Sequence, residues 1–101
     1  MTTSSNTEKA KLVTIVAASE LWDRLEGDLR HLGVKGYTVV TASGRGGHGL
    51  REGGFLVTGN VRVETVVSAE VAHAIFQHLA HTYPGRELTA YEHEVQALVR
   101  H

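Results

Sequence analysis

The sequence predicts an α+β fold in which two helices cover one face of a four-stranded antiparallel sheet. Its 101 residues, 42% of them hydrophobic, suit one domain with a single modest core. Apolar residues recur with a period of two in predicted strands and of about 3.6 in predicted helices. Along the chain these segments follow the order β-α-β-β-α-β. Two βαβ-like halves with right-handed crossovers arrange this order as a ferredoxin-like sandwich.

The first strand and the first helix are predicted within residues 11–33. Residues 11–18 read KLVTIVAA, a β-branched apolar run that is typical of a buried strand. We expect Ser19 to cap the following helix and Gly33 to end it. The apolar side chains of this helix recur at spacings of three and four residues: Leu21, Trp22, Leu25, Leu29 and Leu32.

Two further strands and a second helix follow. Short β-branched runs predict strands over residues 37–41 and 61–67. In the second of these, valines on one face alternate with Arg62 and Glu64 on the other. Ser68 is expected to cap a helix over residues 69–81, which buries Val71, Ala72, Ile75, Phe76 and Leu79.

The last strand is predicted over residues 88–99, after the helix-breaking Pro84 and Gly85. It places one set of side chains on a single face: Tyr91, His93, Val95 and Ala97. With both helices on one side of the sheet, this face has no cover from the chain itself. We therefore expect it to meet another subunit, so that the protein is a homo-oligomer.

The remaining composition narrows the class of protein. Residues 1–10 are polar and are expected to form a disordered tail before a single domain at 11–101. The polar first residues lack the apolar region of a signal peptide, and no apolar run is long enough to cross a bilayer, so we expect a cytoplasmic protein. Its formal net charge of −1 argues against nucleic-acid binding, and the absence of cysteine excludes thiolate catalysis.

Residues 42–60 form a long glycine-rich connection between the second and third strands. Seven of the chain's eleven glycines lie there, interleaved with Arg45, His48 and Arg51. Glycines let backbone N–H groups converge on an anion, and arginine provides a fork for phosphate. On composition alone, an anion-binding loop and a flexible tether with incidental charges are equally good interpretations.

The stretches GVKGYTV, GRGG and VRVETVV, on a chain with this order of elements, resemble the PII signalling superfamily. The resemblance covers residues 11–99 and is strongest to the PII-like branch of SbtB and the carboxysome-associated PII proteins. It implies a homotrimer with inward-facing sheets and adenine nucleotide in the clefts between subunits. Residues 42–60 would be the T-loop, which contacts a bicarbonate transporter or a carboxysome-associated protein.

The same resemblance implies which residues bind the nucleotide. Gly36 and Thr38 match the adenine edge, and Glu64 matches the acidic residue opposite them. Further matching positions lie on the phosphate side: Gly44, Arg45, Gly46, Arg51, Gly85 and Arg86. The T-loop residues expected to contact the protein partner are Gly47, His48, Gly49, Leu50, Glu52 and Phe55.

The chain also departs from the PII pattern in its loop. Gly46 stands where PII proteins have glutamine, Gly47 stands where they have lysine, and residues 42–60 contain no tyrosine. These departures disfavour 2-oxoglutarate sensing and tyrosyl modification. They favour ADP or AMP over ATP, with bicarbonate as a second ligand near Arg45 and His48.

Two other functions fit the same fold. His78 and His81 are spaced HxxH on the second helix, so a CutA-like trimeric metal-binding protein is the main alternative, although no third ligand is in register. An RNA-binding module would need more aromatic side chains on the open sheet face than Tyr37 and Tyr91 provide. No nucleophile with an adjacent base and no paired carboxylates in a cleft are evident, so we expect neither catalysis nor a metal centre.

Overall fold

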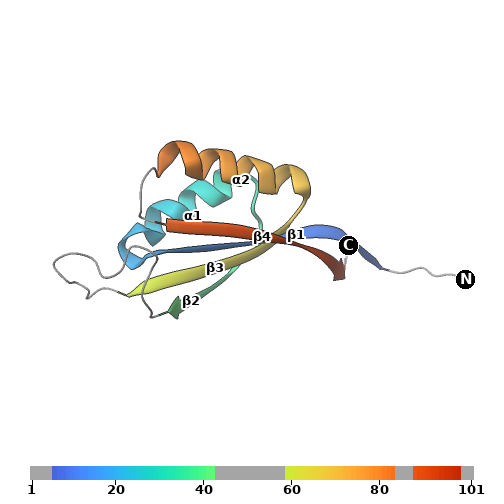
Figure 1. The fold of residues 1–101 in the computed structure, drawn as a ribbon, viewed down its shortest axis with the longest axis horizontal. Helices are drawn as coiled ribbons and strands as arrows, with labels where there is room; N and C mark the ends of the chain where they lie inside the picture. Colours follow the sequence, from blue (N-terminus) through green and yellow to red (C-terminus); the bar gives the residue numbers. More distant parts are fainter. Residues whose placement is uncertain (1–5, 43–58, 84–87, 99–101) are drawn as a thin grey trace, which may run out of the picture.

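The computed structural model describes residues 6–42, 59–83 and 88–98, and within them it confirms the predicted sandwich (Figure 1). An antiparallel sheet in the order β2-β3-β1-β4 carries both helices on one face. The strands are β1 (Thr7–Ala18), β2 (Thr38–Ala42), β3 (Asn60–Val67) and β4 (Leu88–Leu98). The helical elements are the short 3₁₀ turn η1 (Ser19–Leu21), α1 (Trp22–His31) and α2 (Ala69–Thr82).

The core lies between the sheet and the two helices. Val13, Ile15 and Val63 of the central strands are fully buried, because every second residue of β1 and β3 faces the helices. Leu25 and Leu29 come from α1, and α2 contributes the three buried side chains of Ala72, Ile75 and Leu79. The predicted Val71 and Phe76 are only partly buried, at the edge of this cluster.

Strand β1 begins at Thr7, earlier than the predicted Lys11, so residues 7–10 belong to the strand and not to a tail. The polar Glu8 and Lys9 hide this extension in the sequence pattern. Pairing with β4 supports it, from Thr7 opposite Leu98 to Ala10 opposite Val95. Because β3 reaches only as far as Lys11, residues 7–10 and 95–98 form a two-stranded ribbon that continues beyond β3 (Figure 1).

The two predicted helix caps have different outcomes. The prediction for Ser19 is wrong: it is the first residue of η1, and the N-cap of α1 is Leu21. The Ser19 N–H donates to the Gly59 carbonyl at 3.1 Å. The chain thus leaves β1 through a 3₁₀ turn before α1 begins. Ser68 is confirmed as the cap of α2, because its hydroxyl accepts from the N–H of Val71 at 3.1 Å.

Gly33 ends α1 as predicted. Its φ of 100° is the only positive φ among the described residues. The N–H of Val34 donates to the Leu29 carbonyl and the N–H of Gly33 to the Arg30 carbonyl, at 3.0 and 3.2 Å. These two bonds are those of a Schellman motif, which needs a left-handed residue at this position.

Alanine substitutions at two glycines should have opposite effects on stability. Gly33→Ala forces a side chain into the left-handed region and should lower the free energy of unfolding by about 1–2 kcal/mol. Gly27 lies inside α1, and a Cβ there would meet no atom within 4 Å. Gly27→Ala should therefore raise the stability by about 0.5–1 kcal/mol. Urea denaturation of both variants checks the pair, and equal shifts would contradict the assigned helix end.

The remaining boundaries shift by one residue or so. Tyr37 lies just before β2, and α2 runs one residue beyond the predicted His81. The predicted last residue of the final strand, Val99, and the predicted breakers Pro84 and Gly85 lie outside the described residues. The exposed Glu92 and Glu94 of β4 form ion pairs with lysines of β1, Lys11 at 3.7 Å and Lys9 at 3.8 Å.

None of the described helices or strands covers the sheet face opposite the helices. Tyr91, on β4, pairs with Thr14 and lies on this face with His93, Val95 and Ala97, as predicted. Val40, Val66 and Tyr91 are exposed there by 39, 53 and 46%. Large apolar side chains left in water in this way favour a contact with another protein surface.

Candidate functional site

A hollow of about 260 Å³ lies where the chain enters β2, beside β3 and β1. Thr38 is the first residue of β2 and stands directly opposite Glu64 of β3. The residues lining the hollow are Leu12, Gly36, Tyr37, Thr38, Glu64, Thr65 and Val66. The structure thus brings together Gly36, Thr38 and Glu64, the three residues predicted to surround one ligand.

Among the described residues that line the hollow, Glu64 is the charged one. Its Oε2 lies 3.9 Å from Nε of Arg62, two residues away on the same side of β3. Both side chains are partly exposed, so this ion pair contributes little to stability and leaves the carboxylate free to accept other hydrogen bonds. Arg62 had been predicted only as the polar side of the strand, and it places a positive charge beside the hollow.

Gly36 gives the hollow an open wall. Its φ is not positive, and a Cβ built on it would meet no atom within 4 Å. Neither the backbone conformation nor the packing of the described residues therefore requires glycine here. The carbonyl of Gly36 accepts a hydrogen bond from the Thr65 hydroxyl at 2.6 Å.

Tyr37, between Gly36 and Thr38, is held from the helix side. Its hydroxyl donates to the carboxylate of Glu26, and its ring packs edge-to-face against Trp22 with centroids 5.4 Å apart. The hydrogen bond to Glu26, together with burial and the nearby negative charge, raises the pKa of Tyr37, so the hydroxyl keeps its proton. Helix α1 therefore holds Tyr37 in place at the edge of the hollow, between Gly36 and Thr38.

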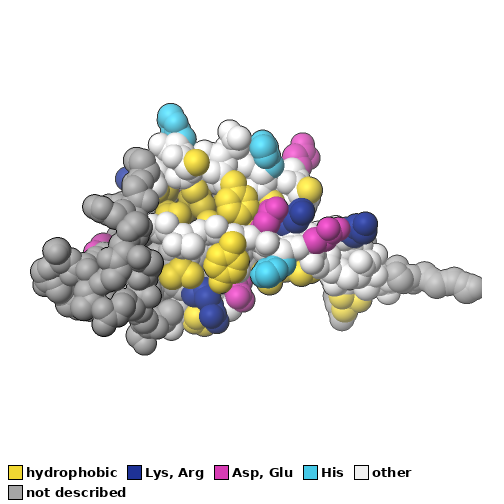
Figure 2. All heavy atoms as spheres, viewed as in Figure 1, with side chains coloured by type: hydrophobic (Ala, Val, Ile, Leu, Met, Phe, Trp, Pro, Cys, Tyr) yellow, Lys and Arg dark blue, Asp and Glu magenta, His cyan; other side chains and the backbone are white. Residues whose placement is uncertain are grey.

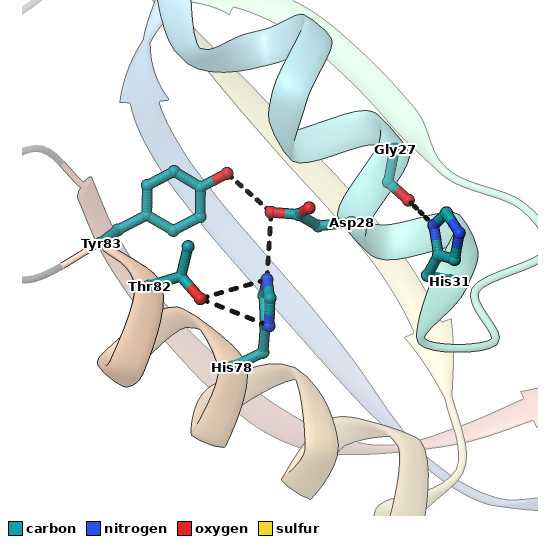
Figure 3. A network of polar contacts seen from close by, with 6 residues as sticks. All are labelled: Gly27, Asp28, His31, His78, Thr82 and Tyr83. Atoms are coloured by element: carbon teal, nitrogen blue, oxygen red, sulfur yellow. Dashed lines mark hydrogen bonds and ion pairs between the residues drawn. The ribbon is translucent and has the colours of Figure 1, made fainter.

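A separate polar cluster joins the two helices on the other side of the molecule (Figure 3). Nε2 of His78 lies 3.0 Å from Oδ2 of Asp28, and the Tyr83 hydroxyl donates to the same oxygen at 2.7 Å. The Thr82 hydroxyl lies 3.4 Å from the His78 ring nitrogens, and the Arg24 guanidinium lies 5.1 Å from the centre of the Tyr83 ring. No motif or spacing in the sequence predicts this cluster.

The pKa values in this cluster follow from the shared oxygen. Burial alone would raise the pKa of Asp28, but hydrogen bonds from Tyr83 and His78 and the charges of His78 and Arg24 outweigh it, so the pKa is lowered. Burial, the bond to Asp28 and the negative charge of Asp28 raise the pKa of Tyr83 to about 12. At neutral pH the cluster therefore holds a carboxylate and a protonated phenol.

The cluster also bears on the metal alternative. His78 points at Asp28, and Figure 2 shows other histidine side chains on the solvent side of α2. Across residues 6–42, 59–83 and 88–98, no three His, Asp or Glu side chains come together as metal ligands.

A second hollow, of about 400 Å³, lies along α2 and is lined by His73, Phe76, Gln77, Ala80 and His81.

Comparison with family models decides between the alternatives. Residues 10–96 match the model of Nitrogen regulatory protein P-II. The chain belongs to the P-II family. This membership confirms the resemblance inferred from GVKGYTV, GRGG and VRVETVV, and it decides against the CutA-like and RNA-binding alternatives.

Solved structures place this P-II family member in the PII-like branch. A PII-like signaling protein of Thermus thermophilus is 40% identical, with a TM-score of 0.77 over 92% of this chain and 93% of that one. CPII of Thiomonas intermedia, bound to ADP, AMP and bicarbonate, is 21% identical with a TM-score of 0.81 over 95 and 94%. Another structure of CPII, bound to ADP and bicarbonate, is 22% identical with a TM-score of 0.80 over 95% of each chain. A search of the curated proteins gave no significant match.

The other predicted site residues of this P-II family protein lie outside the described residues. They are Gly44, Arg45, Gly46, Gly47, His48, Gly49, Leu50, Arg51, Glu52, Phe55, Gly85 and Arg86. Their roles in phosphate and partner binding stay predictions. Within the described part of the chain, no helix is long and apolar enough to cross a membrane.

Proposed function

We propose that this PII-like signalling protein binds ADP or AMP at clefts between the subunits of a homotrimer. The adenine base would enter the hollow at the start of β2. The observation that carries this proposal is the meeting of Gly36, Thr38 and Glu64 in one hollow. The bound nucleotide would set the conformation of residues 42–60, which would regulate a carbon-uptake or carboxysome-related partner in the cytoplasm.

The chemistry of the hollow suits a purine. The Glu64 carboxylate can accept from an exocyclic amine, and the Thr38 hydroxyl can donate to or accept from a ring nitrogen or amine. Gly36 adds a surface without a side chain, against which a flat base can lie. Leu12 and Val66, which are paired across β1 and β3, supply apolar contacts.

The size and position of the hollow support a cleft between subunits. Its volume of about 260 Å³ is below the roughly 300–1,000 Å³ of complete small-molecule pockets. Val66 lines the hollow and is also exposed by 53% on the uncovered sheet face. A neighbouring subunit packed on that face would therefore complete the walls of the hollow.

Bicarbonate and the T-loop complete the proposal. CPII has been crystallised with ADP, AMP and bicarbonate, which supports the same ligand classes here, with ATP as a weaker ligand. Phosphate would neutralise Arg45 and Arg51 and draw the loop amides toward it. The loop would then populate one conformation that a partner distinguishes.

A thermal-shift panel with ATP, ADP, AMP, 2-oxoglutarate and bicarbonate tests this function. A ligand at 100 times its Kd stabilises by about 2.7 kcal/mol, which raises the Tm of a domain this size by on the order of 10 °C. We expect such shifts with ADP and AMP, and sedimentation of the protein as a trimer. A monomer that responds to none of the adenylates would refute the proposal.

Arg45→Ala should weaken ADP binding by about ten- to a hundredfold, because it removes a bidentate phosphate contact. The fold should be unaffected, since residue 45 lies in the long connection between β2 and β3. Isothermal titration calorimetry measures the affinity, and circular dichroism checks folding. Arg30→Ala, which removes an exposed arginine of α1, is the matched control. Unchanged affinity in folded Arg45→Ala protein would remove this residue from the site.

A further inference from the structure

We propose that Thr65 is a positioning residue for the ligand: its buried hydroxyl fixes the Gly36 carbonyl and thereby sets the wall of the hollow. This inference rests on the proposed function, since it concerns the same adenine site. It adds a residue that neither the sequence pattern nor the resemblance assigned.

The hydrogen bond joins two segments that are 29 residues apart in the sequence. Thr65 lies on β3, opposite Val13 of β1, and is only 3% exposed. Its hydroxyl donates to the Gly36 carbonyl at 2.6 Å, a short and favourable distance for this type of bond. Its neighbours on the strand, Glu64 and Val66, point to the other side of the sheet and line the hollow.

The bond stands where the sheet ladder ends. The pairing of β2 with β3 begins at Thr38 opposite Glu64, so Gly36 lies two residues before the first paired position. The paired positions of β2 and β3 therefore do not include the peptide between Gly36 and Tyr37. The Thr65 side chain supplies a bond to this peptide, from a strand that the core holds rigidly.

The residue type at this position also needs an explanation. Val61, Val63 and Val67 occupy the other helix-facing positions of β3. Valine has nearly the same shape as threonine, so packing alone would accept it. A buried hydroxyl is costly unless it is hydrogen-bonded, and here its acceptor is the wall of the hollow. We infer that the hydroxyl serves the site.

Two anchors then determine where Gly36 sits. Tyr37 is tied to α1 through Glu26 and Trp22, and Gly36 is tied to β3 through Thr65. Without the second anchor, the peptide before Tyr37 could rotate and change the depth of the hollow. The adenine contact would lose complementarity even though every lining residue remained.

The test compares Thr65→Val, Thr65→Ala and Thr65→Ser by calorimetry with ADP. Valine and alanine remove the hydroxyl and should weaken binding by at least tenfold, whereas serine keeps it and should bind within about threefold of the parent protein. The amide chemical shifts of Tyr37, measured without nucleotide, should move in Thr65→Val, because the preceding carbonyl loses its hydrogen bond, and should stay near the parent values in Thr65→Ser. Thr41→Val, at an exposed position of β2 on the helix-facing side of the sheet, is the control for the same exchange of side chains on a strand.

The outcomes separate the two proposals. If the parent protein binds neither ADP nor AMP, the proposed function fails. If the parent binds and folded Thr65→Val binds equally well, the positioning role is wrong. Equal losses in Thr65→Ser and Thr65→Val would also overturn it, because the hydroxyl would then not be the cause.

Discussion

Gly36→Ala is expected to reduce ADP affinity by about a hundredfold or more while leaving the domain fully folded. A Cβ at this position would meet no protein atom within 4 Å, so the added methyl group would stand in open space beside the hollow. In the complex, the proposed base would occupy that space, and the overlap would prevent close contact. Calorimetry with ADP measures the loss.

The stability of Gly36→Ala distinguishes a blocked site from a damaged fold. Since Gly36 does not have a positive φ, alanine should leave the free energy of unfolding unchanged or raise it by up to about 1 kcal/mol. Gly27→Ala, an open glycine in α1, is the matched control and should keep full ADP affinity. If Gly36→Ala binds ADP as tightly as Gly27→Ala does, the base lies elsewhere.

Asp28→Ala should lower the free energy of unfolding by about 3 kcal/mol, because its carboxylate accepts from a buried phenol and faces the second helix. Oδ2 of Asp28 accepts a hydrogen bond from the hydroxyl of Tyr83, a residue that is 5% exposed. The same oxygen lies 3.0 Å from Nε2 of His78. Removing it leaves the phenol without its partner and uncouples the two helices. Urea denaturation at neutral pH measures the effect. Asp23→Ala, at an exposed position of the same helix, is the control and should cost well under about 1 kcal/mol.

The contribution of Asp28 should depend on pH at both extremes. Its pKa is lowered by folding, so the stabilisation is present above the ordinary value of 3.8 and is lost as the pH falls through the lower folded value. The pKa of Tyr83 is raised from 10.0 to about 12, so its contribution is present below pH 10 and is lost as the pH rises through 12. The difference between the parent and Asp28→Ala should therefore narrow in acid and in strong alkali. A constant difference from acid to strong alkali would contradict the assigned network.

Periodicity predicted the order of the elements because the core residues recur along each one. The alternation of β3 and the leucine spacing of α1 record local geometry that a sequence displays directly. The strand residues 7–10 were missed because Glu8 and Lys9 face water, and only their pairing with β4 identifies them. Ser19 was misassigned because a 3₁₀ turn intervenes between β1 and α1.

The site was predictable only where family motifs mark it. Gly36, Thr38 and Glu64 stand in such motifs, and the fold does bring them together. The supporting contacts were invisible in the sequence because each joins distant residues: Thr65 to Gly36 over 29 positions, and Tyr83 to Asp28 over 55. Side-chain hydrogen bonds of this kind have no periodicity, so only the folded chain reveals them.

The ribbon formed by residues 7–10 and 95–98 has a practical consequence for engineering. Thr7 and Leu98 are directly paired, so the two outermost described strand positions are neighbours in space. Joining them through a short linker would close the backbone into a ring with little entropic penalty. A circularly permuted gene could then open the chain between two other elements, while the pairing of β1 with β4 keeps the two linked positions together.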